Sequence, residues 1–195
     1  MRGSRTLLPA LLVVGSVSLF AAGPGTATSG AILITAKVFT PITLGEYTAT
    51  MQFGDVFPGS AAGTVVLKPL DNTISFTGTG LSLSTIDPTS CANIVVSGRR
   101  NASFSVAFST ATLTSSQSGA TSSMTVDTWT AATANVGADS WTVLGNGNGN
   151  TGTSAKLPDI ASSKCQLRMG GTLNVPAGTL DGDYSGSYTV TVTYN

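Results

Sequence analysis

The chain contains no histidine, and this absence limits the chemistry that it can perform. Nucleophilic Ser-His-Asp and Cys-His sites both need an imidazole, and most zinc sites use at least one. A catalytic site would therefore have to depend on the nine acidic residues of the chain.

Three of these acids occur where a site could form. Asp181 and Asp183 are two residues apart in an expected turn, and Asp55 lies near another turn. Glycoside hydrolysis needs two carboxyl groups that face each other across about 5 to 9.5 Å, and nothing in the spacing indicates such a pair. Calcium prefers several carboxylates in one loop, whereas the Gly-Asn-rich stretch 145–154 has none. We therefore expect no enzyme, no metal and no cofactor.

Two tryptophans leave a binding function open. Trp129 and Trp141 could stack on sugar rings, although aromatic residues in strands belong more often to the core. The adjacent basic pair Arg99 and Arg100 follows a predicted strand and is expected in a solvated turn. Because charged residues are only 9% of the chain and the net charge is +0, nothing favours a nucleic acid as partner.

The N-terminus is typical of a secretory signal peptide. Arg2 and Arg5 precede an uncharged apolar run at 7–22, and small residues follow at 25–27. The run is shorter than the ~20 residues of a spanning helix, which argues against the alternative of a membrane anchor. We expect cleavage after Ala27 and no membrane span in the mature chain.

The two cysteines of the exported part are expected to form a disulfide. Cys91 and Cys165 are far apart in the sequence and have no metal-binding partners nearby. Disulfides are common in exported proteins, and one that closes so long a loop is worth about 4 kcal/mol in the chain-entropy account. We interpret this pair as a structural crosslink.

Beyond residue 27 the apolar residues alternate with a period of two, and no helical period lasts more than a turn. Short alternating segments separated by turn residues predict an all-β sandwich. The expected strands are 31–40, 47–53, 63–67, 73–77, 93–96, 102–109, 123–129, 140–144, 166–175 and 185–194. The expected organisation is a signal peptide at 1–27, an N-terminal strand segment at 28–45 and the sandwich at 46–195.

The N-terminal segment has the pattern of a strand with one apolar face. That face is formed by Ile32, Ile34, Ala36 and Val38. Thr35 and Lys37 lie on the opposite face, and Pro41 confines the following point to an edge, a bulge or a change of sheet.

The C-terminal segment alternates in the same way up to its penultimate residue. Its apolar face consists of Tyr188, Val190, Val192 and Tyr194. Burial of four such side chains is worth roughly 6 to 12 kcal/mol, which equals the net stability of a typical domain. Such a strand needs a neighbour that covers its face and pairs with its backbone.

The C-terminal segment resembles the last strand of chaperone-usher pilins, which has a penultimate tyrosine and a glycine fourteen places from its end. Tyr194 and Gly182 occupy those positions. The whole chain resembles the bacterial family called domain of unknown function 4402, through AKVFTPITL, MQFGDVFPG, GTVVL and GGTLNVPAGTLDGDYSGSYTVTVTYN. It is also similar to the spore-coat-U and archaic pilin group.

The pilin resemblance implies an immunoglobulin-like sandwich that lacks one strand and is completed by the N-terminal strand of a neighbouring subunit. Ile32, Ile34, Ala36 and Val38 would be the donor residues, and the C-terminal strand would form part of the groove wall. The expected partners are other copies of the chain, a periplasmic chaperone and an outer-membrane usher, and the expected location is the cell surface. The alternative is a self-contained secreted surface domain that binds a glycan or a host surface.

Overall fold

The structure is a computed structural model, and it describes residues 35–36, 38, 40–84, 86–117, 120–144 and 153–195. The chain divides into two compact units, Met1–Val38 and Phe39–Asn195. Only Thr35, Ala36 and Val38 of the first unit are described, so the fold is that of the second unit. The expected strand at 31–40 lies mostly outside the described residues, and its described members are not in a strand.

The described part of the chain is all-β, and its strands pair antiparallel, as the alternating pattern predicts. It contains no helix with the length and apolarity that a membrane crossing requires. The strands are β1 Thr43–Ala49, β2 Val56–Phe57, β3 Gly63–Lys68, β4 Thr73–Thr77, β5 Ser82–Leu83, β6 Ala92–Ser97, β7 Ser103–Phe108, β8 Ala111–Gln117, β9 Ala120–Asn135, β10 Thr142–Val143, β11 Thr153–Lys156, β12 Lys164–Val175 and β13 Val190–Tyr194.

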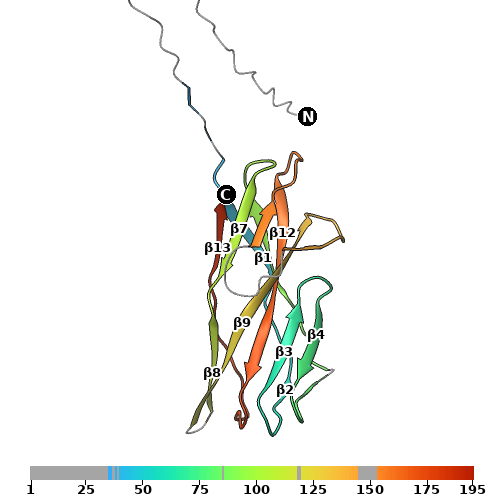
Figure 1. Cartoon of the computed structure of the whole chain (residues 1–195), viewed down its shortest axis with the longest axis vertical. Coiled ribbons are helices and arrows are strands. Elements are labelled where there is room, and N and C mark those ends of the chain that lie inside the picture. The colour runs from blue at the N-terminus through green and yellow to red at the C-terminus, as the bar shows by residue number, and fades with distance from the viewer. Residues whose placement is uncertain (1–34, 37, 39, 85, 118–119, 145–152) are drawn as a thin grey trace, which may run out of the picture. The chain divides into compact units, whose positions relative to one another are not determined.

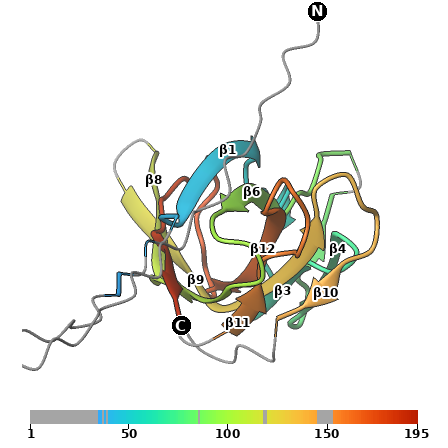
Figure 2. The same cartoon turned by 90° about the horizontal axis from the view of Figure 1, so that it is seen from above.

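The 12-residue strand β12 organises the larger sheet (Figure 1). One of its edges pairs with β9 from Cys165 to Asn174. Its other edge pairs with β6 over 164–169 and then with β3 over 171–175. Outer strands extend the sheet, because β1 pairs with β6, β4 with β3, and both β8 and β10 with β9. Seen from above, β1, β6 and β12 follow one another across this layer (Figure 2).

The change of partner on β12 takes place at two glycines. A Cβ atom on Gly170 would overlap the backbone carbonyl oxygen of Leu67 on β3. A Cβ atom on Gly171 would lie 3.3 Å from Cε3 of Trp129. Position 170 therefore needs a residue without a side chain, because another backbone approaches closely, and a side chain at position 171 would meet tight contacts.

A β-bulge on β9 lies opposite this glycine pair. Gly170 pairs with Thr130 and Thr172 pairs with Asp127, so two residues of β9 face one residue of β12. Thr128, within the bulge, has a φ of 48°, an unusual conformation for a β-branched residue. The bulge places Trp129 in the core, where it is 1% exposed.

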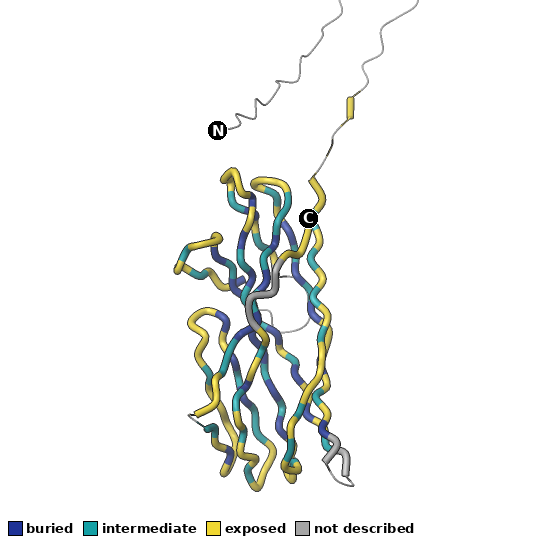
Figure 3. Tube along the Cα trace, turned by 180° about the vertical axis from the view of Figure 1, so that it is seen from behind, coloured by how far each residue is buried: buried dark blue, intermediate teal, exposed yellow. Residues whose placement is uncertain are grey.

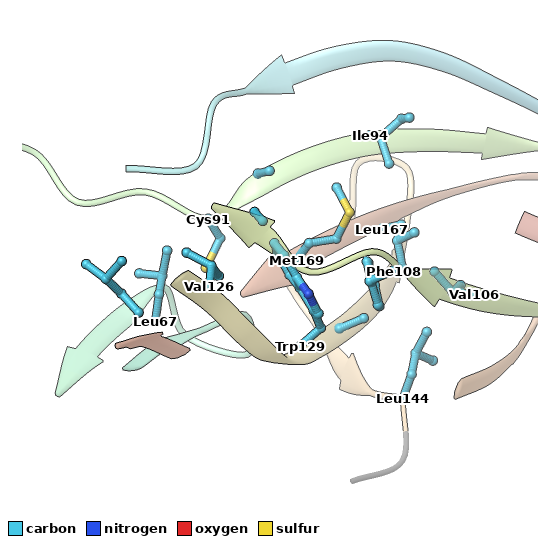
Figure 4. Close-up of a cluster of buried hydrophobic side chains, with 14 of the residues drawn as sticks. Leu67, Cys91, Ile94, Val106, Phe108, Val126, Trp129, Leu144, Leu167 and Met169 are labelled. Atoms are coloured by element: carbon cyan, nitrogen blue, oxygen red, sulfur yellow. The ribbon is translucent and has the colours of Figure 1, made fainter. Parts of the chain in front are cut away.

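The second layer is the three-stranded sheet β11-β7-β13. The ring centroid of Trp129 lies 5.5 Å from that of Phe108 on β7 and 4.4 Å from that of Tyr188, which precedes β13. Figure 4 shows part of this core, and Figure 3 shows that buried residues follow the strands while many of the connecting turns are exposed. The largest fully buried side chains are Trp129, Phe104, Leu67, Ile94, Leu157, Leu167, Met169, Leu173, Val65, Val96, Val106 and Val126.

The C-terminal segment runs antiparallel to β7 and β8 beyond the bounds of β13. The amide of Ser109 donates to the carbonyl of Thr189 at 3.0 Å, and the amide of Thr114 donates to the carbonyl of Ser185 at 2.9 Å. The backbone of 185–194 is thus paired along one edge over nearly the whole of the predicted strand.

Several expected strands are found, and Thr73–Thr77 has the predicted bounds. No strand is expected between 110 and 122, yet β8 and β9 pair there, with β8 paired from Ala111 to Gln117. Serine and threonine fill both faces of this hairpin, so it has no apolar alternation to mark it. The expected boundary between the N-terminal strand segment and the sandwich, after residue 45, falls inside β1. The pairing of β1 with β6 begins at Thr43.

The expected disulfide between Cys91 and Cys165 is wrong, since both residues are free and buried. Cys165 pairs with Val96 near the end of β6, whereas Cys91 directly precedes the start of that strand. Five residues of strand rise separate the two sites by about 17 Å, and a disulfide needs Cα atoms within about 7 Å.

Burial raises the pKa of each of the two thiols from 9.0 to about 11. The folded protein therefore favours the neutral thiol more strongly than the unfolded chain does. This stabilisation is complete below pH 9 and is lost as the pH rises through about 11. We expect a loss of about 2 kcal/mol per thiol by pH 11 in denaturant titrations. The double variant Cys91→Ala/Cys165→Val should lose less stability than wild type over the same rise in pH, because it has no thiols to ionise. An equal loss in wild type and variant would show that the buried thiols are not its cause.

Replacement of Gly170 by alanine should destabilise the fold, because the added methyl group overlaps the backbone of β3. We expect a loss of about 2 to 4 kcal/mol in the free energy of unfolding. Gly45→Ala in β1 is the matched control, since its Cβ would meet only ordinary contacts, the nearest at 3.5 Å. Equal stability of the two variants in thermal unfolding would show that the close approach at Gly170 is unimportant.

Candidate binding groove

β1 and β13 are edge strands of the two different sheets. Each pairs with one neighbour, β1 with β6 and β13 with β7, and no strand in the described part of the chain pairs with the other edge of either. An unpaired edge offers a row of free N–H and C=O groups to an additional strand. Two such edges flank one side of the sandwich.

Tyr194 joins these edges at one end. Its hydroxyl donates to the carbonyl of Thr40, three residues before β1, at 2.9 Å. The same oxygen accepts from the amide of Arg99, just after β6, at 2.6 Å. We call this place the tyrosine end. A Cβ atom on Gly98 would overlap the Tyr194 hydroxyl, so this glycine leaves room for the ring.

A groove of about 740 Å³ opens toward the other end. One wall is the segment 51–58 that follows β1, and the other is the segment 179–184 that leads toward β13. Since β1 continues into one wall and the other wall continues into β13, the two edge strands run in opposite directions between the tyrosine end and this opening. The floor is apolar and consists of Leu113 on β8, Met124 on β9, and Leu173 and Val175 on β12.

Carboxylates line the rim of the groove. Asp55, Asp87 and Asp183 are all exposed and all among its lining residues. The side-chain hydrogen bond with Asp87 is the main cause that raises the pKa of Asp55, and the charges of Asp87 and Asp183 raise it further. The carboxyl group of Asp55 is therefore close enough to Asp87 and Asp183 to be repelled by both. We call this place the acidic end.

The four predicted residues of the C-terminal strand share the core-facing side, as the alternation predicts. Tyr188, Val190, Val192 and Tyr194 are half-buried and pack against the core cluster. The alternating threonines Thr189, Thr191 and Thr193 are exposed. The incomplete burial of the apolar side chains is consistent with an edge that nothing covers.

Gly182 lies in the wall of the groove and has a φ of 148°, a conformation that favours glycine. Of the predicted donor residues, Ala36 is exposed and Val38 is 94% exposed. Ile32 and Ile34 lie outside the described residues. The structure thus brings Gly182 and the C-terminal strand to one side of the sandwich.

The two tryptophans are poorly placed for stacking on a sugar. Trp129 is buried in the core. Trp141 is half-buried, and the guanidinium carbon of Arg168 lies 3.7 Å from the centre of its ring, which covers one face.

Arg100 forms an exposed ion pair with Asp159 at 2.9 Å, in agreement with a solvated turn. Most of the Gly-Asn-rich stretch lies outside the described residues.

Sequence reasoning missed most of the groove lining. Leu113, Met124 and Leu173 look like any other strand residue in the sequence, and Asp87 looks like a turn acid. No local signal marks them, because the groove assembles from segments that are far apart along the chain.

Within the described ranges, no group of three or more His, Cys, Asp or Glu residues is arranged to hold a metal ion.

Comparison with known proteins gives one family. No curated protein matches the chain, and no solved structure matches it. The family described as Domain of unknown function (DUF4402) matches residues 42–194, a range that contains every strand and the whole groove lining. The chain is therefore a member of the DUF4402 family.

Proposed function

We propose that the chain is a non-enzymatic structural subunit of a bacterial surface fibre. The N-terminal strand of one copy fills the groove of a neighbouring copy and completes an immunoglobulin-like sandwich, as in the pilins that the C-terminal segment resembles. The observation that carries this proposal is the pair of edge strands β1 and β13, each unpaired on one side within the described residues, together with the groove between the segment that follows β1 and the segment that leads toward β13.

The unpaired edge of β13 supports this function because it carries none of the usual protection. Isolated proteins guard edge strands with charged residues, proline or bulges, but the stretch 184–195 contains no charged residue and no proline. An added strand would pair with this free backbone and cover Val190 and Val192, which are half-buried. Main-chain hydrogen bonds then supply affinity, and pockets for alternate side chains supply specificity.

The N-terminal segment has the pattern that such a groove accepts. Residues 31–39 would extend over about 30 Å as a strand, and their apolar residues Ile32, Ile34, Ala36 and Val38 fall on one face. Ala36 and Val38 are exposed in the isolated chain. An apolar face on an extended segment and an apolar floor in a groove are complementary.

Export of the subunit follows from the signal peptide that the first 27 residues are expected to form. We propose that a periplasmic chaperone protects the groove before assembly and that an outer-membrane usher supports assembly at the cell surface. Cys91 and Cys165, free and buried, would leave the subunit without a crosslink.

Ile34→Asp should prevent assembly, because it places a charge on the face of the donor strand that enters the groove. The loss of an isoleucine contact worth 1.5 to 3 kcal/mol, together with a buried charge, should reduce polymer formation about a hundredfold or more. The measurement is the ladder of bands resistant to mild detergent in a gel of the exported chain. Thr35→Asp is the matched control, since the neighbouring side chain points to the opposite face. Similar ladders from both variants would contradict the proposed strand.

Deletion of residues 28–40 should leave a subunit that cannot donate a strand. We expect no ladders from this variant and incorporation of it only at one end of a wild-type polymer, which electron microscopy with a tagged variant would detect. If the truncated chain stays a stable monomer and the full-length chain never forms ladders, the chain is a self-contained surface domain instead. Binding to a glycan array would then be the measurement to make.

A further inference from the structure

The side of the sandwich that carries the free edges of β1 and β13 has two chemically different ends, with the groove at one of them. Asp55, Asp87 and Asp183 lie at the acidic end. The tyrosine end includes Arg99, whose amide is bonded to Tyr194, and Arg100 follows it. A charged residue on the inserted strand would therefore have opposite interactions at the two ends.

The N-terminal segment 28–45 has a single charged side chain, that of Lys37. Lys37 lies on the face opposite to Ile34 and Ala36, so in an inserted strand it points away from the floor and toward the rim. The exposed carboxylates of Asp55 and Asp183 lie on that rim. Charge complementarity thus favours an arrangement in which Lys37 lies at the acidic end.

The lysine of the same chain cannot reach that end. Thr40 is held at the tyrosine end by Tyr194, and three extended residues span about 10 Å. The paired stretch 185–194 separates the two ends by roughly 30 Å of strand. Any contact between Lys37 and the acidic rim must therefore come from a second copy of the chain.

We propose that the N-terminal segment of a second copy enters the groove at the acidic end, antiparallel to β13, and that its Lys37 forms ion pairs with Asp55, Asp87 and Asp183. This inference depends on the proposed function. In this direction Thr40 of the donor remains just outside the groove, so the sandwich of the donor follows directly below the acidic end of the acceptor. The ion pairs offset the repulsion of Asp55 by Asp87 and Asp183 and set the direction of insertion.

Charge reversal tests this contact on the full exported chain. Lys37→Glu and Asp55→Lys should each slow the formation of detergent-resistant ladders about tenfold at low salt, because rim charges act mainly on association rates. The double variant Lys37→Glu/Asp55→Lys should recover a rate within about twofold of wild type. The differences should shrink near 1 M salt, where the screening length is about 3 Å.

Matched controls reverse exposed charges outside the groove. Lys156→Glu on β11 and Asp139→Lys before β10 should leave the rate unchanged. Equal rates for wild type, Lys37→Glu and Asp55→Lys would overturn the ion pairs while the strand exchange stands. The ion pairs would also be overturned if the double variant were as slow as either single variant. The same holds if chelation of divalent cations abolished the ladders. Absence of ladders from wild type would overturn the proposed function itself.

Discussion

The fold depends on the pairing of β12 along both of its edges. One edge is used by a single long partner, β9, and the other is shared by β6 and β3. Two short strands can share an edge only if the chain makes room where one ends and the next begins. Gly170 and Gly171 provide that room, and the bulge on β9 adjusts the facing strand and brings Trp129 into the core.

The two sides of the sandwich differ because of this arrangement. Around β12 every backbone edge is used, and the side chains there include many of the fully buried ones. On the opposite side β1 and β13 belong to different sheets and do not pair with each other. The apolar side chains of Leu113, Tyr188, Val190, Val192 and Tyr194 are therefore only partly buried. A binding surface of this kind is a consequence of topology, since it needs no special residues.

Sequence patterns predict the elements of this structure better than their assembly. The alternation in 166–175 identifies β12, and that in 185–194 identifies the paired C-terminal stretch, because each has one face in the core. The hairpin of β8 and β9 escapes prediction, since hydroxyl side chains on both faces give no contrast. The separation of Cys91, just before β6, from Cys165 on β12 depends on the register of the two strands, which the distance between the cysteines in the sequence does not reveal. The same holds for Asp55, Asp87 and Asp183, which three separate loops bring together.

The bond between Tyr194 and Thr40 has a mechanical consequence. A pull on the chain ahead of Thr40 first reaches the sandwich at this hydroxyl and then enters β1 along the direction of the strand. The hydrogen bonds between β1 and β6 are perpendicular to that direction, so the force loads them together in shear and does not open them one at a time. Tyr194 is thus the point where tension on the chain before Thr40 passes into the sandwich.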